Sequence, residues 1–481
     1  MIALLLILIP VVGGIAAWIL RGETIIKTWS LLVSLASLAV MSVGLLGGLT
    51  PAETTFNTAW LGQLGASFSL HMDGISAVLC LLTVLAYPLI LLSTWNNTYK
   101  NSAAFYALML LAQAGIMGVF LAYDGLLFYF FWELALIPVY FLSSIWGGER
   151  RIAVTFKFFI YTFIGSLLML AGLIYLYYQT PDQSFAWSSL KAVQPTGIKG
   201  ALVFWFFFIA FAIKMPIFPF HTWQPDTYEQ SPTAVTMVLS ALMVKMGLFA
   251  VVRWLIPLFP AAAIAYDNII IGLSVVGMIY ASLLALKQDD LKRLIAYASI
   301  AHIGLMAAAL FLNNEVAMQG AAIQFFSHGV NVLGLWIVVD FIEQKMGTRK
   351  MSELGGLASK APVLSILLVV VSLANVALPL TNAFIGEFLM FNGLYKFNVW
   401  YAAVGGLSII LSAIYTLNMI QKLCFGTVSA ATQAAVDLPR SAAFSMVVIV
   451  VAIFVFGIYP APFFEMTKDA VADMITFFTK Q

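Results

Sequence analysis

Residues 211–223 read Phe-Ala-Ile-Lys-Met-Pro-Ile-Phe-Pro-Phe-His-Thr-Trp, which places a lysine and two prolines in a long apolar run. Residues 378–388 read Leu-Pro-Leu-Thr-Asn-Ala-Phe-Ile-Gly-Glu-Phe, where a glutamate follows the proline. Proline removes a backbone donor and clashes with the preceding turn, so each stretch predicts a helix that is locally unwound. Because unwound backbone at membrane depth is tolerated only inside protein or beside water, each break predicts an ion site.

The composition of the whole chain agrees with helices that lie in lipid. Of its 481 residues, 62% are hydrophobic and 9% are charged, whereas a soluble domain carries about 25% charged residues. A soluble chain this apolar could not cover its surface, so lipid is the solvent that fits. The net charge of +2 gives no reason to expect a nucleic-acid partner.

The sequence indicates no cofactor, metal or redox centre of its own. The two cysteines, Cys80 and Cys424, lie far apart in apolar runs. Iron–sulfur and structural zinc sites need about four closely spaced ligands, and one cysteine pair makes no disulfide framework. No glycine-rich nucleotide motif follows a strand-like run. We therefore expect this chain to bind none of these groups.

Apolar segments long enough to span a membrane recur along the chain. With roughly 20 residues needed for each crossing, we count about fourteen segments, which predicts an all-α, polytopic membrane protein. Their centres lie near Ile9, Ser37, Leu85, Leu111, Ala135, Leu168, Phe207, Leu242, Val275, Ala301, Val330, Val371, Ile410 and Val450. Residues 49–72 are polar and predict a long loop.

The distribution of basic residues predicts an orientation. With the N-terminus outside, the inner loops hold Arg21, Lys27, Lys100, Arg150, Arg151, Lys287, Lys292, Arg293, Lys345, Arg349, Lys350, Lys360, Lys422 and Arg440. The outer loops hold only Lys191, Lys199, Arg253, Lys396, Lys468 and Lys480. By the positive-inside rule, both termini should lie on the outer side of the membrane.

The two proline breaks suggest an internal repeat. We divide the chain into three N-terminal helices (1–100), two groups of five helices (101–258 and 259–428), and a last helix with a tail (429–481). Each break then falls on the fourth helix of its group. Because five is odd, the two groups would be inverted relative to one another, as in many transporters.

Six ionisable residues fall inside apolar segments: Glu133, Lys214, Lys245, His302, His328 and Glu387. A charge at the bilayer centre costs at least ~2.5–3.5 kcal/mol, so such residues mark functional sites by default. A lysine and a glutamate whose separation or hydration changes can take up and release a proton. Histidine titrates near neutral pH and suits a relay between them. We therefore predict proton transfer through these six residues.

Several of these residues have alternative interpretations. Glu133 and Lys214 could instead form a structural ion pair that locks two helices. His302 could be an interhelical hydrogen-bonding residue. His221, just past the first break, fits loop packing and a relay equally well. Lys157 follows two arginines and is interpreted as snorkelling to the inner interface.

Four further carboxylates, Asp73, Asp124, Asp226 and Glu229, lie at predicted helix ends. Short acidic side chains there commonly accept hydrogen bonds from the free N–H groups of the first helical turn. We predict capping or solvation for them rather than proton transfer.

Motifs along nearly the whole chain resemble the antiporter-like subunits of respiratory complex I. They are Trp132-Glu133, Lys214-Met-Pro-Ile-Phe-Pro-Phe-His-Thr-Trp-Gln-Pro-Asp, Ser231-Pro-Thr-Ala, Gln288-Asp-Asp-Leu-Lys-Arg-Leu-Ile-Ala-Tyr-Ala-Ser-Ile-Ala-His-Ile-Gly and Phe384-Ile-Gly-Glu-Phe. The resemblance implies fourteen core helices, two inverted repeats with hydrated half-channels, and redox chemistry in other subunits. It also implies roles: Glu133 and Lys214 as a paired switch, Lys245 as central relay, His302 and His328 along the axis, and Glu387 as terminal group.

A glutamate rather than a lysine in the second broken helix, Glu387, resembles the M-type branch of that family. This resemblance implies other complex I membrane subunits as partners, with the antiporter-like subunits L and N as neighbours. Two positions depart from the family pattern. Tyr228 stands where a second histidine is usual, so no proton-loading role is carried to it. Ala377 replaces a glycine before the second break. Similar subunits also occur in multisubunit sodium/proton antiporters and membrane-bound hydrogenase-type complexes, and a purely structural subunit is a third possibility.

Overall fold

The computed structural model describes residues 1–479, and 13 helices in that range are long and apolar enough to cross a membrane. They are α1 (Ile2–Ile19), α2 (Glu23–Leu46), α4 (Gly74–Ser93), α5 (Ser102–Leu121), α6 (Gly125–Trp146), α7 (Arg151–Gln179), α9 (Gly197–Lys214), the continuous helix from α11 to α13 (Thr233–Leu258), α15 (Asp267–Leu286), α16 (Leu291–Leu310), α17 (Glu315–Met346), α21 (Val399–Cys424) and α22 (Arg440–Ile458). Each contains one predicted centre. The remaining span, predicted around Val371, is divided into α19 (Pro362–Asn375) and α20 (Asn382–Phe397). The polytopic all-α prediction is confirmed. Lys480, assigned above to the outer tail, lies outside the described residues.

Among the described residues, side-chain caps start five of the long helices. The carboxylate of Asp73 accepts a hydrogen bond from the N–H of Ser76, and that of Asp124 accepts from the N–H groups of Leu126 and Leu127. The same arrangement starts three more helices, with caps at Asp290, Asn314 and Asn398. Such caps satisfy N–H groups that have no partner inside the helix. The predicted capping roles of Asp73 and Asp124 are therefore confirmed.

The first break separates α9 from α10 (Trp223–Gln230), and neighbouring groups satisfy the backbone that it frees. The indole Nε1 of Trp223 donates to the carbonyl oxygen of Ile213 at 3.0 Å. Gly247 lies against the start of the break, where an added Cβ would sit 2.6 Å from the backbone nitrogen of Met215. The helix that carries Lys245 therefore packs directly on the end of the helix that carries Lys214.

The second break separates α19 from α20, and α17 supports it from one side. The amide of Asn331 donates to the carbonyl oxygen of Ala374 at 3.2 Å, and the hydroxyl of Ser327 donates to that of Asn382 at 3.1 Å. Within the break, Ala377 has a φ of 57° and Leu380 a φ of 74°. The broken helix is fourth in the group from α15 to α21, as the first break is in the group from α5 to α13.

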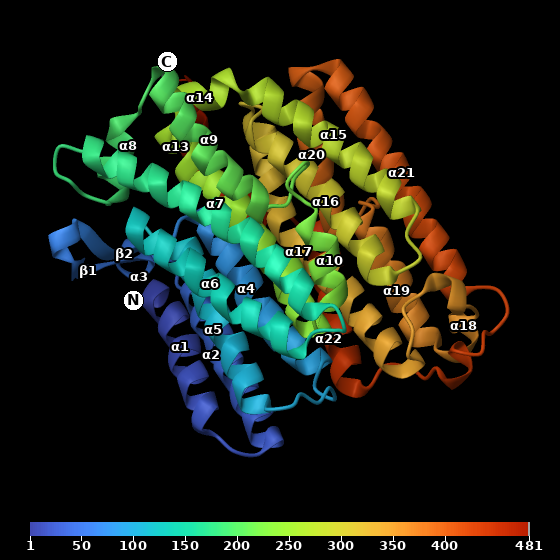
Figure 1. Ribbon diagram of the computed structural model, residues 1–481. Coiled ribbons are helices and arrows are strands. Elements are labelled where there is room, and N and C mark those ends of the chain that lie inside the picture. Colours follow the sequence, from blue (N-terminus) through green and yellow to red (C-terminus); the bar gives the residue numbers. More distant parts are fainter. Residues whose placement is uncertain (480–481) are drawn as a thin grey trace.

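Two elements at one face of the bundle were not predicted. Within residues 49–72, expected to be a loop, β1 (Thr55–Leu61) pairs antiparallel with β2 (Ala66–His71), in the register Thr55↔His71. The tail forms α23 (Ala461–Thr479), too charged for a span, which packs on α4 and α17. Polar and apolar residues alternate in these strands, as in a half-exposed β-hairpin. A search for long apolar runs does not detect such a pattern. We call the surface with the N-terminus, this hairpin and α23 the hairpin face (Figure 1).

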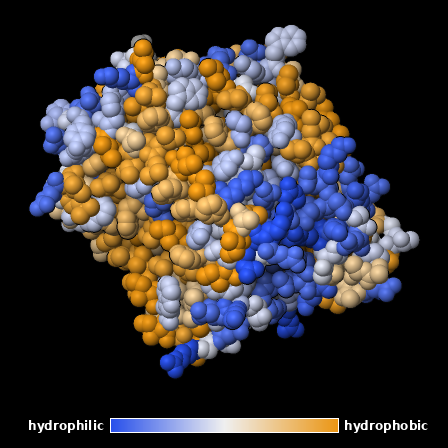
Figure 2. All heavy atoms as spheres, viewed as in Figure 1, coloured by the Kyte–Doolittle hydropathy of each residue, from blue (hydrophilic) through white to orange (hydrophobic). Residues whose placement is uncertain are grey.

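Short elements join the spans: α3 (Pro51–Thr54), η1 (Gly62–Leu64), α8 (Trp187–Val193), α14 (Pro260–Ala265), η4 (Met351–Glu353), α18 (Leu357–Lys360) and η5 (Thr432–Ala434). Large apolar side chains, among them Ile152, Phe156, Ile366 and Phe444, are exposed on the outer surfaces of the spans. Figure 2 shows this orange hydrophobic belt, with hydrophilic residues gathered at the lower right. Such a surface suits lipid, so the chain is a multi-pass membrane protein.

Candidate functional site

Lys245 and His328 form a direct contact in the centre of the bundle. The Nζ atom of Lys245 lies 2.7 Å from the Nδ1 atom of His328. Lys245 lies between two π-helical turns, η2 (Leu239–Met243) and η3 (Val251–Leu255), and its Nζ also donates to the carbonyl oxygen of Ser240 at 3.0 Å. Because wider turns of this kind often mark functional sites, the local geometry fits a lysine that is positioned for chemistry. Both side chains are buried.

The contacts continue from His328 toward the second break. The Nε2 atom of His328 lies 3.2 Å from the hydroxyl of Ser299, and its ring centroid lies 5.7 Å from that of His302. His302 in turn places its Nδ1 atom 2.9 Å from the Oε1 atom of Glu387. Four of the six predicted residues therefore lie in one buried line: Lys245, His328, His302 and Glu387.

Two amide side chains that were not predicted as site residues, Gln324 and Asn375, hold the end of this line. The amide of Gln324 donates to the Oε1 atom of Glu387 at 3.3 Å. The Nδ2 atom of Asn375 lies 3.4 Å from the Nε2 atom of His302. Both are polar residues inside predicted apolar spans, and this position in the sequence could have marked them as site residues. His302 thus bridges helices, as its alternative interpretation expected, and also contacts the carboxylate at the end of the line.

The first half differs, because Glu133 and Lys214 are not in ion-pair contact. Within the described residues, the Nζ atom of Lys214 and the Oε1 atom of Glu133 are both buried without a hydrogen-bond partner. The Nζ atom lies 5.2 Å from the ring centroid of Trp132, next to Glu133 in sequence, and is within electrostatic reach of that carboxylate. A lock between two helices would need a closed contact, so this geometry disfavours the purely structural interpretation of the pair.

Lys157 and His221 lie outside the buried line. The Nζ atom of Lys157 contacts Asp226 at 2.9 Å and donates to the carbonyl oxygen of Thr222 at 2.8 Å, so it is paired rather than simply snorkelling. His221 is buried beside the rings of Phe218 and Tyr280, which is the loop-packing environment.

For Asp226 and Glu229 the prediction was capping or solvation, and the capping alternative is wrong: both carboxylates belong to a network of ion pairs at the face opposite the hairpin. Arg293 contacts Asp226 at 2.9 Å and Glu229 at 2.8 Å. Glu229 also pairs with Arg150 and with Arg349. These contacts join segments far apart in sequence, which no local pattern reveals.

Two basic residues assigned above to inner loops are instead buried in helices. Lys292 lies in α16 and contacts Glu343 at 2.8 Å, and Lys27 lies in α2 and contacts Glu23 at 2.7 Å. Both residues lie close to helix ends, where counting apolar residues cannot place the boundary.

Arg253 was assigned above to an outer loop, and this is also wrong. It lies in η3, on the continuous helix that carries Lys245, and its side chain is 9% exposed. Its Nη2 atom contacts Asp73 at 2.5 Å and donates to the hydroxyl of Ser76 at 3.2 Å. Burial alone would raise the pKa of Asp73, but the charge of Arg253 and hydrogen bonds from Ser76 outweigh it, so this pKa lies below its usual value.

Broken helices with buried ionisable groups beside them define a class of membrane protein, in which ion-transfer sites are built at the breaks. The chain belongs to the NADH:quinone oxidoreductase/Mrp antiporter transmembrane family, whose model matches residues 122–414.

Curated relatives and solved structures agree with this assignment. NADH-quinone oxidoreductase subunit M of Rhodobacter capsulatus is 34% identical over 468 residues, covering 93% of this chain and 90% of that protein. Its counterpart from Escherichia coli is 32% identical over 496 residues, covering 98% and 97%. A chain of respiratory complex I from Thermus thermophilus superposes with a TM-score of 0.92 at 29% identity, over 99% of this chain and 100% of that one. A chain of the Mrp complex from a Dietzia species shares the fold, with a TM-score of 0.88 at 18% identity and coverage of 98% and 97%.

Proposed function

We propose that this chain is a proton-translocating membrane-arm subunit of an NADH:quinone oxidoreductase, with the redox chemistry in other subunits. The protons would pass through Glu133, Lys214, Lys245, His328, His302 and Glu387. The proposed role needs no cofactor or metal in this chain, because side chains alone carry the protons.

The buried line from Lys245 to Glu387 is the observation that carries this proposal. Each neighbour in it can give or take a proton, and the contacts Lys245–His328 and His302–Glu387 are 2.7 and 2.9 Å long. A side chain that transfers a proton must lie within about 2.6–3.2 Å of its partner, or reach it through one water. The two imidazoles, with ring centroids 5.7 Å apart, fit transfer through one intervening water.

Protons would reach this line from the first half, through Glu133 and Lys214. Neither group is locked in an ion pair within the described part of the chain, so their separation is free to change. The end of α9 packs on the helix of Lys245 at Gly247, which brings the two lysine-bearing helices together. In this scheme, a change at Glu133 alters the charge felt by Lys214, and a proton passes on to Lys245.

The position of Glu133 on the outer surface of α6 supports the proposal that another membrane subunit of the complex covers this part of the chain. Glu133 lies on a stripe of α6 whose large neighbours Phe130, Ile137 and Phe141 are all exposed. An ionisable residue on a lipid-facing stripe is costly, whereas a subunit interface would shelter it. We assign this interface to a neighbouring antiporter-like subunit, with L and N as the two neighbours in the membrane arm.

For the membrane, we propose the bacterial inner membrane with the hairpin face outward. The bacterial relatives and the excess of basic residues in the loops of the opposite face support this orientation. Both ends of the described chain then lie on the periplasmic side.

The proposal is tested on the assembled complex in liposomes. Glu133→Ala and Lys214→Ala should leave assembly intact and lower NADH-driven proton uptake at least ~10-fold, because a positioned proton-transfer group contributes about 10²–10⁴-fold to a rate. Glu465→Ala on the exposed side of α23 is the matched control and should pump normally. Normal pumping by the assembled Glu133 and Lys214 variants would overturn the proposal. Proton transport driven by a sodium gradient, without NADH or quinone, would instead assign the chain to a sodium/proton antiporter.

A further inference from the structure

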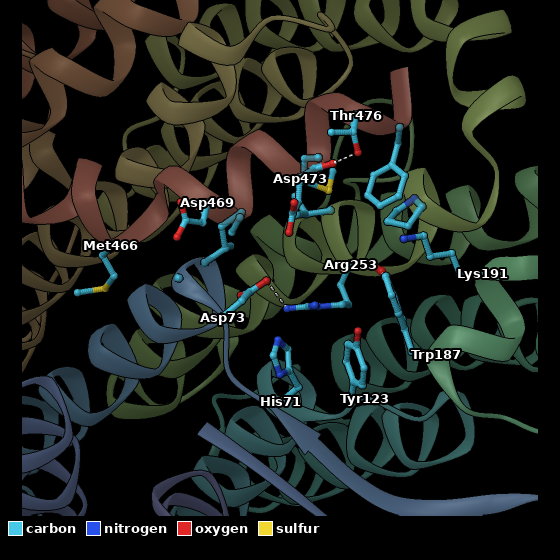
Figure 3. A pocket seen from close by; sticks show the side chains of 17 residues that line it. His71, Asp73, Tyr123, Trp187, Lys191, Arg253, Met466, Asp469, Asp473 and Thr476 are labelled. Atoms are coloured by element: carbon cyan, nitrogen blue, oxygen red, sulfur yellow. Dashed lines mark hydrogen bonds and ion pairs between the residues drawn. The ribbon is translucent and has the colours of Figure 1, made fainter. Parts of the chain in front are cut away.

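A polar cavity of about 570 Å³ opens on the hairpin face and ends at Arg253. Its walls come from the end of β2, the start of α4 and the helix α23 (Figure 3). Titratable side chains line it, among them His71, Asp73, Asp469 and Asp473, and the last two are exposed at its rim. Protons on that side of the membrane can therefore enter the cavity.

Only a short distance separates the bottom of this cavity from the buried line. Arg253 follows Lys245 by eight residues on one continuous helix, which corresponds to about 12 Å along the axis. Phe249 lies between them, 5.5 Å from the guanidinium of Arg253 and 5.5 Å from the ring of Phe120. Arg253, which lines the cavity, and the ring of Phe249 therefore lie along the helix between the cavity and Lys245.

Arg253 is held firmly in this place. Its Nη2 atom contacts Asp73 and Ser76, and its own carbonyl oxygen accepts a hydrogen bond from the indole of Trp187 at 3.0 Å. At Gly74, an added Cβ would lie 1.8 Å from the carbonyl oxygen of Met466, so the backbone of α23 lies directly on the start of α4, next to Asp73. The ion pair is therefore fixed by the fold around it.

The chemistry of arginine differs from that of every group on the proposed proton path. Lysine, histidine and glutamate can each lose and regain a proton, whereas a guanidinium stays protonated in proteins and passes none on. A fixed positive charge in a water-filled opening also repels protons and other cations. Burial, and then the charge of Arg253, lower the pKa of His71, so this neighbour is neutral at physiological pH.

We propose that Arg253, held by Asp73, is a proton barrier that closes the hairpin face of the first half and isolates Lys245 from that side. A proton on Lys245 then leaves only through His328 toward the second half. This inference rests on the proposed function, because a barrier matters only if Lys245 carries protons. Without it, the cavity would join a route that reaches Lys245 through Lys214, and protons would run back passively.

The test measures passive proton influx into liposomes that contain the assembled complex, with a pH gradient imposed and no NADH or quinone present. Arg253→Ala should raise the influx severalfold, because the fixed charge that repels cations in this opening is lost. Arg253→Lys keeps a positive charge beside Asp73 but can release its proton, so its influx should lie between those of the wild type and Arg253→Ala. Lys292→Ala breaks a similarly buried ion pair near the opposite face and should leave the influx unchanged, since the hairpin face stays closed.

A double variant separates this inference from the proposed function. Lys245→Ala combined with Arg253→Ala should return the influx to the wild-type value, because the leak is expected to pass through Lys245. If Arg253→Ala prevents assembly, Arg253→Gln with Asp73→Asn keeps a polar pair without charge and should leak in the same way. An unchanged influx in these assembled variants, or a leak that survives the loss of Lys245, would overturn the barrier. Normal pumping by Lys245→Ala alone would overturn the relay role of Lys245 in the proposed function, whereas an unchanged influx in the Arg253 variants would overturn the barrier alone.

Discussion

Lys245 is fully buried, yet its amino group has two acceptors, the Nδ1 atom of His328 and the carbonyl oxygen of Ser240. A buried ammonium needs such partners, because an unpaired one costs far more than a hydrogen bond returns. When Nδ1 accepts from lysine, the other nitrogen of the neutral imidazole carries the hydrogen and donates to Ser299. A proton passed from Lys245 would then leave a charged imidazole that faces His302.

Replacing His328 tests this step. His328→Leu keeps a side chain of similar size but removes the group that takes the proton from Lys245. We expect NADH-driven proton uptake to fall about tenfold or more in the assembled complex. Ser299→Ala removes only the hydrogen bond at the other nitrogen and should retain most of the uptake. Equal uptake by the His328 variant and the wild type would contradict a relay through this residue.

The pKa of Asp73 gives a prediction about stability and pH. Its native pKa lies below the unfolded value of about 3.9. The carboxylate therefore contributes its full stabilisation above about pH 3.9, and this is lost as the pH falls through the lower native value. The unfolding temperature of the detergent-solubilised complex should exceed that of Asp73→Asn by a constant amount near neutral pH, and the difference should shrink below about pH 4. A difference that grows on acidification would contradict the Asp73–Arg253 pair.

At the scale of elements, the two breaks show what the sequence could predict. The prolines at 216, 219 and 379 located both breaks, because the effect of proline on a helix is local. The groups that support the breaks come from elsewhere: Asn331 and Ser327 of α17 donate to carbonyl oxygens on either side of the second one. Likewise, the contact between Lys245 and His328 joins residues 83 positions apart. Spacing in the sequence could not predict such pairs. The sequence therefore identified the candidate site residues but not which of them are in contact.

Ala377 is an element-scale case in which a departure from the family pattern has a measurable cost. Its φ of 57° is in the left-handed region, which costs a residue with a Cβ about 1–2 kcal/mol. Ala377→Gly should therefore stabilise the protein, by up to ~1 kcal/mol after the greater flexibility of glycine in the unfolded chain is subtracted. The unfolding temperature of the solubilised complex should rise slightly. The same substitution in the helical backbone of α19, Ala374→Gly, should lower it; a lower value for Ala377→Gly would contradict the left-handed conformation.

At the scale of the whole molecule, apolar length predicted the membrane spans well, because about 20 residues are needed whatever the helices contact. Apolar length wrongly placed Arg253, Lys292 and Lys27 in loops. It also did not detect the hairpin and α23, which are too polar to be read as membrane spans. These polar elements gather at the two faces, where packing between distant segments decides burial. The faces therefore carry the ion pairs, while the centre carries the line of titratable groups.

The measurement that tests the central claim most directly is NADH-driven proton uptake by liposomes containing the assembled Glu387→Gln complex. Glutamine keeps an oxygen and an amide for His302 and Gln324 but cannot carry a proton. We predict that uptake falls about tenfold or more while the complex remains assembled. Uptake at the wild-type rate would contradict proton transfer along the line from Lys245 to Glu387.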